Sequence, residues 1–195
     1  NGRIPYRIYR PGAVVGHSKT GFIDKIDGPY YFFKALQKLR EYWPRWMPLV
    51  GVEGGYLTLV PVDYVVDAMV YLSHAKGLDG RCFHLTDPKV RRVGEVLNIF
   101  ARAAHAPEMA FRLDSKIFDM VPDGVRKSVE RTRPIQNVFD QVLRDLQVPK
   151  SVLQFINYPT RFDSTATQKA LAKARIHVPP LEDYAWRLWD YWERH

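Results

Sequence analysis

The chain has little of what marks secreted or membrane-spanning proteins. It contains one cysteine, Cys82, so no internal disulfide can form, which fits a reducing compartment. No apolar run approaches the roughly 20 residues that a membrane span needs. The N-terminal segment NGRIPYRIYR has neither an initiator Met nor the apolar core of a signal peptide. We therefore expect a soluble, cytoplasmic protein.

Several motifs of known chemistry are also missing. The segment GVEGG, residues 51–55, lacks the Gly-x-Gly-x-x-Gly spacing of a dinucleotide cradle, and no long helix is expected after it. The six histidines show no spacing typical of metal ligands, so no metal site is predicted. Ser18 has no recognisable His and acid partners. Cys82 lies in the apolar run GRCFH, which favours a packed thiol over a nucleophile.

The chain carries an excess of positive charge. Its 29 Lys and Arg residues against 21 acids give a formal net charge of +8. The basic residues are spread along the chain, and the densest run, RKSVERTR at 126–133, contains a glutamate. Neither zinc-finger spacing nor an aromatic and basic RNA-binding signature occurs. The charge therefore favours phosphate-bearing cofactors or substrates, and nucleic-acid binding is not expected.

The first half of the chain alternates apolar strand patterns with helical ones. A buried strand is predicted through Ile4, Tyr6 and Ile8, continuing to Val14 and Val15. Such an alternation is typical of the end of an α/β parallel-sheet domain. The further elements expected here are a helix over 29–43 after the cap Asp27, extended segments over 48–62 around Gly54-Gly55, a helix over 64–75 capped by Asp63 with Val66, Met69, Val70 and Leu72 buried, a strand over 80–87, and a helix over 93–105.

The pattern becomes mostly helical after Pro107. One more strand is predicted over 110–116, and helices are predicted over 116–155, over 164–174 with Asp163 as cap, and over 180–195. The last of these is amphipathic and carries Tyr184, Leu188, Trp189 and Trp192 on its apolar side. We therefore predict an α/β fold with residues 1–107 in a Rossmann-like parallel-sheet domain and residues 108–195 in a helix-rich substrate lobe.

One pair of residues matches a catalytic spacing. Tyr30 and Lys34 form Tyr-x-x-x-Lys, and one helical turn would bring the two side chains together, so that the lysine lowers the pKa of the phenol. The chain has eleven tyrosines, however, so a chance match at this spacing is unsurprising. We interpret the pair as a coincidence.

Three segments resemble the extended short-chain dehydrogenase/reductases, and they occur in that family's order. IPYRIYRPGAVVG (4–16) resembles the strand and loop that follow the catalytic helix, and TLVPVDYVVDAMVYL (58–72) resembles the later segment that opens a helix. LDGRCFHLTDPKVRRVGEVLNIFARAAH (78–105) is similar to the strand and helix after it. A narrower similarity, to bacterial fatty acyl-CoA reductases of the "male sterility" type, lies in 21–39 and 158–195.

The resemblance implies that this chain is the C-terminal portion of a longer reductase. The glycine fingerprint and the catalytic Tyr and Lys would belong to an N-terminal, cofactor-binding half absent from this chain, so no catalytic residue is assigned here. The chain alone is expected to be inactive. By position in the family's pattern, the cofactor NADPH would contact Pro11, Gly12, Ala13, Val14 and His17.

The resemblance also implies a substrate side. The residues matching it are Ser18, Lys25, Asp27, Tyr30, Phe118 and Phe139. The expected substrate is a fatty acyl-CoA or fatty aldehyde, which places the protein in lipid metabolism, and peripheral membrane contact stays open. Arg126, Lys127, Arg131 and Arg133 suit coenzyme A phosphates or a plain solvated face. The alternatives are a nucleotide-sugar epimerase, a sterol dehydrogenase, or a binding module without catalysis.

Overall fold

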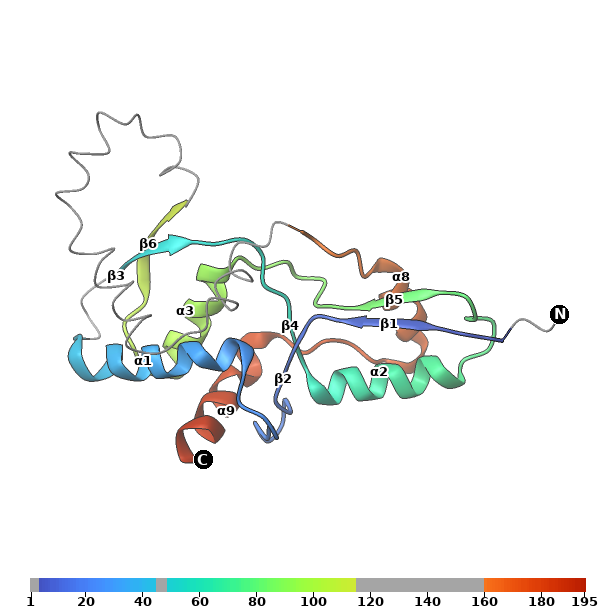
Figure 1. Cartoon of the computed structure of the whole chain (residues 1–195), viewed down its shortest axis with the longest axis horizontal. Coiled ribbons are helices and arrows are strands. Elements are labelled where there is room, and N and C mark those ends of the chain that lie inside the picture. Colours follow the sequence, from blue (N-terminus) through green and yellow to red (C-terminus); the bar gives the residue numbers. More distant parts are fainter. Residues whose placement is uncertain (1–3, 45–48, 115–159) are drawn as a thin grey trace. The chain divides into compact units, whose positions relative to one another are not determined.

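A computed structural model describes residues 4–44, 49–114 and 160–195. Its internal contacts divide the chain into two compact units. Unit 1 consists of residues 1–25, 58–91 and 160–195, and unit 2 of residues 26–57 and 92–159 (Figure 1). The boundary predicted at residue 107 stays a prediction, because residues 115–159 of the predicted helical lobe lie outside the described residues.

Unit 1 contains two pairs of parallel strands. The first strand of each pair comes from the same stretch of chain, residues 8–15. Strand β1 (Ile8–Pro11) pairs with β5 (Cys82–Leu85), and β2 (Ala13–Val15) pairs with β4 (Leu59–Pro61). The chain changes neighbour at Gly12, whose N–H donates to the Leu85 carbonyl at 3.1 Å. A Cβ on Gly12 would lie 2.7 Å from the Thr58 carbonyl oxygen, so only glycine fits this crossing. The predicted parallel α/β architecture is confirmed.

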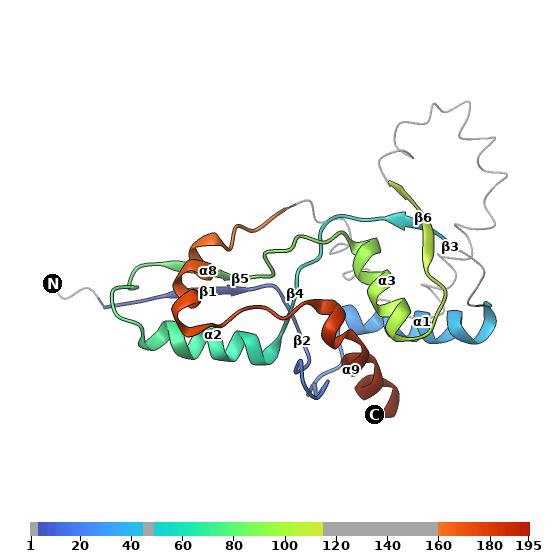
Figure 2. The ribbon, with the colours of Figure 1, turned by 180° about the vertical axis from the view of Figure 1, so that it is seen from behind.

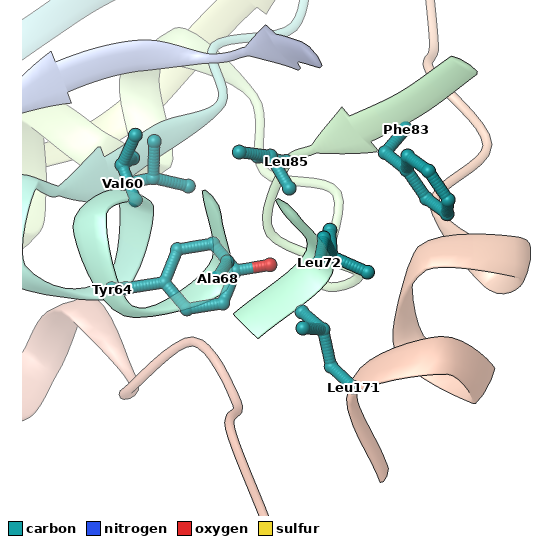
Figure 3. Close-up of a cluster of buried hydrophobic side chains, with 8 residues drawn as sticks. Val60, Tyr64, Ala68, Leu72, Phe83, Leu85 and Leu171 are labelled. Atoms are coloured by element: carbon teal, nitrogen blue, oxygen red, sulfur yellow. The ribbon is translucent and has the colours of Figure 1, made fainter. Parts of the chain in front are cut away.

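The helices of unit 1 pack on these strands. They are α2 (Val62–His74), α8 (Thr165–Leu171) with the short helix η3 (Ala172–Ala174), and α9 (Leu181–Arg194). Figure 1 and the reverse view in Figure 2 both show α2 running along β1 and β5. The core between them is apolar, and Figure 3 shows seven of its side chains labelled: Val60, Tyr64, Ala68, Leu72, Phe83, Leu85 and Leu171. Burial of each large aliphatic side chain contributes about 1.5–3 kcal/mol.

The buried face of α2 differs from the predicted one. Val66 and Val70 are 51% and 56% exposed, and Met69 is also exposed. The residues facing the core are Tyr64, Val65, Ala68 and Leu72. Apolar side chains occur on both sides of this helix, so spacing alone could not decide which side packs against the strands. The outer side is left as an exposed apolar stripe of Val66, Met69 and Val70, which we call the α2 stripe.

The N-terminal strand is also more exposed than predicted. Ile4 is 84% exposed, and Tyr6 and Ile8 are exposed as well. Among the described residues β1 has one paired strand, β5, so its other edge is open. Cys82, predicted to be a packed thiol, is exposed on β5. The predicted strand is confirmed from Ile8 to Val15, where it is divided into β1 and β2, but Ile4 and Tyr6 precede it. Its predicted burial is confirmed at Val15 and wrong for the other four residues named in the prediction.

Unit 2 is built around aromatic packing. Helix α1 (Tyr31–Tyr42), preceded by the short helix η1 (Gly28–Tyr30), contacts α3 (Val93–Ala103), and strand β3 (Leu49–Glu53) pairs in parallel with β6 (Met109–Asp114). The ring of Phe33 lies 4.9 Å from Tyr30 and 4.8 Å from Phe100. The helices predicted over 29–43 and 93–105 and the strand over 110–116 are confirmed. The helices predicted over 116–155 lie outside the described residues.

Within the described part of the chain, no helix is both long enough and apolar enough to cross a bilayer.

Candidate cofactor-loop site

The loop after β2 is closed by its own backbone. The His17 N–H donates to the Phe22 carbonyl at 2.9 Å, and the Gly21 N–H donates to the His17 carbonyl at 2.8 Å. We call residues 16–22 the Gly16 loop. It stands at the carboxyl end of β2, beside the carboxyl end of the parallel strand β4. In open α/β sheets this edge is where ligands bind.

Two residues 45 positions apart in the chain meet at this edge. The Ser18 N–H donates to Asp63 Oδ1 at 2.9 Å, and the Ser18 hydroxyl donates to Asp63 Oδ2 at 2.6 Å. Asp63 was predicted to cap α2, and this is wrong: Pro61 occupies the N-cap position, and Asp63 lies in the first helical turn. Its carboxylate instead ties the Gly16 loop to the start of α2.

This contact sets the protonation state of Asp63. Partial burial raises the pKa of the Asp63 carboxyl, but hydrogen bonds from the Ser18 hydroxyl, the Ser18 N–H and its own backbone N–H together outweigh burial. The net result is a pKa below the ordinary value. Asp63 is therefore an acceptor-only carboxylate at neutral pH, which orients the Ser18 hydroxyl as its donor.

His17 presents one ring nitrogen to the outside. Its Nδ1 accepts a hydrogen bond from the Lys19 N–H at 3.1 Å, which requires a lone pair on Nδ1 and favours the neutral tautomer with its proton on Nε2. Nδ1 also lies 4.0 Å from Asp63 Oδ2, but that distance is an ion pair only for a protonated ring. In the tautomer that accepts this bond, the ring's other nitrogen, Nε2, carries the proton and can donate to a ligand.

The residues before the loop use most of their polar groups internally. The N–H groups of Gly12 and Ala13 donate to Leu85 and Thr58, and Pro11 is paired with Leu85. Val14 is 41% exposed and gives this stretch an apolar surface. The structure thus brings residues 11–18 and Asp63 together in unit 1, and their predicted cofactor contacts stay a prediction.

The other predicted site residues lie elsewhere. Lys25 is exposed in unit 1, and Asp27 is exposed in unit 2, at the N-cap of η1 without a side-chain capping bond. Tyr30 is buried in the aromatic core of unit 2, whereas Lys34 is exposed. Phe118 and Phe139 lie outside the described residues, as do Arg126, Lys127, Arg131 and Arg133.

Sequence reasoning missed a polar groove beside this site. It has a volume of about 190 Å³ and is lined by Asp63, Tyr64, Asp67, Arg175, Ile176, His177 and Pro179. Asp63 and Asp67 lie one turn apart on α2. This spacing of two acids is the sequence signal that could have indicated the groove. Within the described ranges, no three His, Cys, Asp or Glu side chains are placed to hold a metal ion.

Part of the chain is similar to a known protein family. The NAD-binding family described as "Male sterility protein" matches residues 1–69, the stretch that holds β1, β2, the Gly16 loop and Asp63. A solved structure, the terminal R domain from the myxalamid PKS-NRPS biosynthetic pathway, is 26% identical with a TM-score of 0.61, covering 98% of this chain and 45% of that domain. These similarities support a relation to the extended short-chain dehydrogenase/reductases.

Two curated relatives of this chain come from Aspergillus flavus. Aldehyde reductase lnbA is 32% identical over 85 residues, which are 44% of this chain and 8% of the relative. Aldehyde reductase lnaA is 26% identical over 172 residues, or 86% of this chain and 16% of the relative. The chain thus spans a small part of these relatives and less than half of the solved R domain.

Proposed function

We propose that the chain is the C-terminal part of an NADPH-dependent reductase of activated acyl groups or aldehydes. The observation that carries this proposal is the Gly16 loop, held by the Ser18–Asp63 contact at the carboxyl edge of two parallel strands. The similarity to an R domain and to two aldehyde reductases supports the reaction class. The chain would supply the loop beside the nicotinamide and part of the substrate pocket.

The loop has the surface that a nicotinamide requires. Val14 offers an exposed apolar side chain for a flat ring, and His17 Nε2–H offers a donor for a carboxamide oxygen. Bound NADPH would supply a hydride for the substrate carbonyl carbon. The residues of this chain orient and shield that reaction, and the proton would come from the N-terminal half.

The proposed substrate is a fatty acyl-CoA or a fatty aldehyde. The family match at residues 1–69 supports an activated acyl group or aldehyde. The net charge of +8 suits a carrier that bears phosphates, such as coenzyme A. The fatty chain is the finer part of the proposal and rests on the resemblance of residues 21–39 and 158–195 to fatty acyl-CoA reductases.

We also propose that an N-terminal half completes the Rossmann domain. The open edge of β1 leaves backbone N–H and C=O groups unpaired, and the α2 stripe exposes apolar side chains. Natural proteins normally cover surfaces of both kinds. The solved R domain is more than twice as long as the part that this chain matches. The missing half would therefore pair with β1 and contribute the catalytic groups.

An assay of NADPH oxidation tests the function. In the intact protein that carries this chain, absorbance at 340 nm should fall when a long-chain acyl-CoA or a fatty aldehyde is added, and should not change with a nucleotide sugar. His17→Ala should raise the KM for NADPH about tenfold through loss of one hydrogen bond, whereas the control His74→Ala, exposed at the other end of α2, should leave it unchanged. An intact protein that binds no NADPH would refute the proposal.

A further inference from the structure

The C-terminal helix α9 lies directly against the Gly16 loop. A Cβ placed on Gly21 would come 2.2 Å from the Arg187 carbonyl oxygen and 2.8 Å from Tyr191 Cβ, and Gly21 has a φ of +74°. A Cβ on Gly16 would come 3.1 Å from Leu188 Cδ2. The loop backbone therefore rests on the side of the helix with no room for a side chain between them.

An aromatic contact extends this interface. The ring of Phe22 meets Tyr191 edge to face, with the ring centres 5.7 Å apart. Leu188 is fully buried beneath the loop, whereas Trp186, on the same helix, is 51% exposed. The side of α9 that carries Leu188 and Tyr191 thus contacts the loop, and the side that carries Trp186 faces solvent.

The helix is itself anchored at its first turn. Arg91 is 4% exposed, and its guanidinium donates to Glu182 Oε2 at 2.8 Å and also binds Asp87. Lys89 donates to Glu182 Oε1 at 3.1 Å. These contacts hold the start of α9 to the segment that follows β5, so the helix cannot shift without breaking the ion pair between buried Arg91 and Glu182.

We propose that α9 is the positioning element of the Gly16 loop, with Gly21 and Tyr191 as its positioning residues. The Ser18–Asp63 contact holds one side of the loop, and α9 holds the other. Between them, His17 and Val14 keep one conformation at the carboxyl edge of β2 and β4. Because the nicotinamide contact of this loop is itself proposed above, the effect on the cofactor rests on that proposal, whereas the effect on the loop does not.

The first variant is Gly21→Ala, with a matched control. Gly77 has nearly the same φ, +76°, but a Cβ there would meet nothing within 4 Å. Gly77→Ala carries the same backbone strain without a clash. In the intact protein, Gly21→Ala should raise the dissociation constant for NADPH about tenfold, by displacing the loop, with a smaller change in the KM for aldehyde. Gly77→Ala should change neither.

A second pair keeps the test decisive if Gly21→Ala does not fold. Tyr191→Ala removes the ring that packs against Phe22 but keeps the Cβ that lies beside Gly21. Trp186→Ala removes an exposed ring from the other side of α9. The readout is hydrogen exchange at the His17 and Gly21 amides, whose bonds close the loop. Tyr191→Ala should speed both exchange rates about tenfold or more, and Trp186→Ala should leave them unchanged.

The exchange rates and the cofactor titration separate the two proposals. Unchanged exchange at both amides in Tyr191→Ala would overturn the positioning role of α9, whatever the activity. Faster exchange with unaltered NADPH affinity would overturn the link from loop to cofactor. A wild-type protein that binds no NADPH would count against the proposed function alone, because the amides report the loop without it.

Discussion

At the scale of single residues, the Ser18–Asp63 contact makes stability depend on pH. The pKa of Asp63 is lower in the folded chain than its ordinary value, so the unfolded chain binds protons more readily as pH falls. The stabilisation is fully present above the unfolded pKa of about 3.9 and is lost as pH drops through the folded one. Ser18→Ala should lower the free energy of unfolding at pH 7 by about 1 kcal/mol, since the Ser18 N–H bond remains. It should also reduce the loss of stability below about pH 4.

The control for this prediction is a similar contact on the surface. Asp163 accepts a hydrogen bond from the Thr165 N–H at 2.8 Å, and its pKa is lowered chiefly by the Thr165 side chain and backbone. This carboxyl is fully exposed, so water replaces the lost bond. Urea titrations of Thr165→Ala at pH 7 and pH 4 should match wild type within error. Equal effects of both variants would contradict the special role of the Ser18–Asp63 contact.

Residue-level chemistry was only partly accessible from the sequence. The segment with Gly12 was identified as a strand and loop, but the close approach of Thr58 that requires glycine there was not predicted. The partner of Ser18 was not predicted, because Asp63 is 45 residues away and a helix cap was an adequate local explanation for it. The Tyr-x-x-x-Lys spacing does not indicate burial, so the buried position of Tyr30 was not predicted.

At the scale of elements, the N-terminus of α3 is capped by a side chain from strand β3. Its own N-cap residue, Arg92, makes no side-chain capping bond. Glu53, at the end of β3 and buried, accepts hydrogen bonds from the Gly94 N–H at 2.8 Å and the Gly54 N–H at 3.2 Å. Glu53→Ala should destabilise the protein by about 2 kcal/mol, because a buried N–H then loses its acceptor.

Two comparisons check the role of Glu53. Glu53→Gln keeps an acceptor oxygen and should cost about half as much as the alanine variant, since the bond loses only its charge. Glu108→Ala breaks an exposed ion pair with Arg102 in the same unit and should cost less than about 1 kcal/mol. Free energies from urea unfolding decide between them. If Glu53→Ala were no worse than Glu108→Ala, the cap would not stabilise α3.

Helices with one apolar side were predicted better than those with two. The segment 180–195 has a single apolar side, and its buried residues Tyr184, Leu188 and Trp189 were predicted correctly. α2 is apolar on both sides, and there the predicted side was wrong. The strand pattern of β1 was identified, but its burial depends on which strands pair with it, and local periodicity does not carry that information.

At the scale of the whole molecule, the parallel α/β class followed from the alternation of strands and helices. That unit 1 is assembled from three separate segments of the chain could not be predicted from this alternation. It depends on contacts such as Lys89–Glu182, between residues 93 positions apart, which no local pattern encodes. The large separation also explains why α9 was predicted as an element but its contact with the Gly16 loop was not.

The α2 stripe gives the molecule-scale prediction. If an N-terminal half covers it, the double variant Val66→Lys and Val70→Lys should destabilise the intact protein by about 2 kcal/mol or more, because two charges would be buried. The isolated chain should keep its stability and bind less of a hydrophobic dye such as ANS, because there the stripe faces water. Ala172→Lys adds charge at an exposed position of the same unit and should leave the stability of both proteins unchanged.

Thermal melts of the intact protein and of the isolated chain provide the measurement. Equal tolerance of the double variant in the two forms would show that the stripe stays open in the intact protein, and the proposed N-terminal half would then have to dock elsewhere.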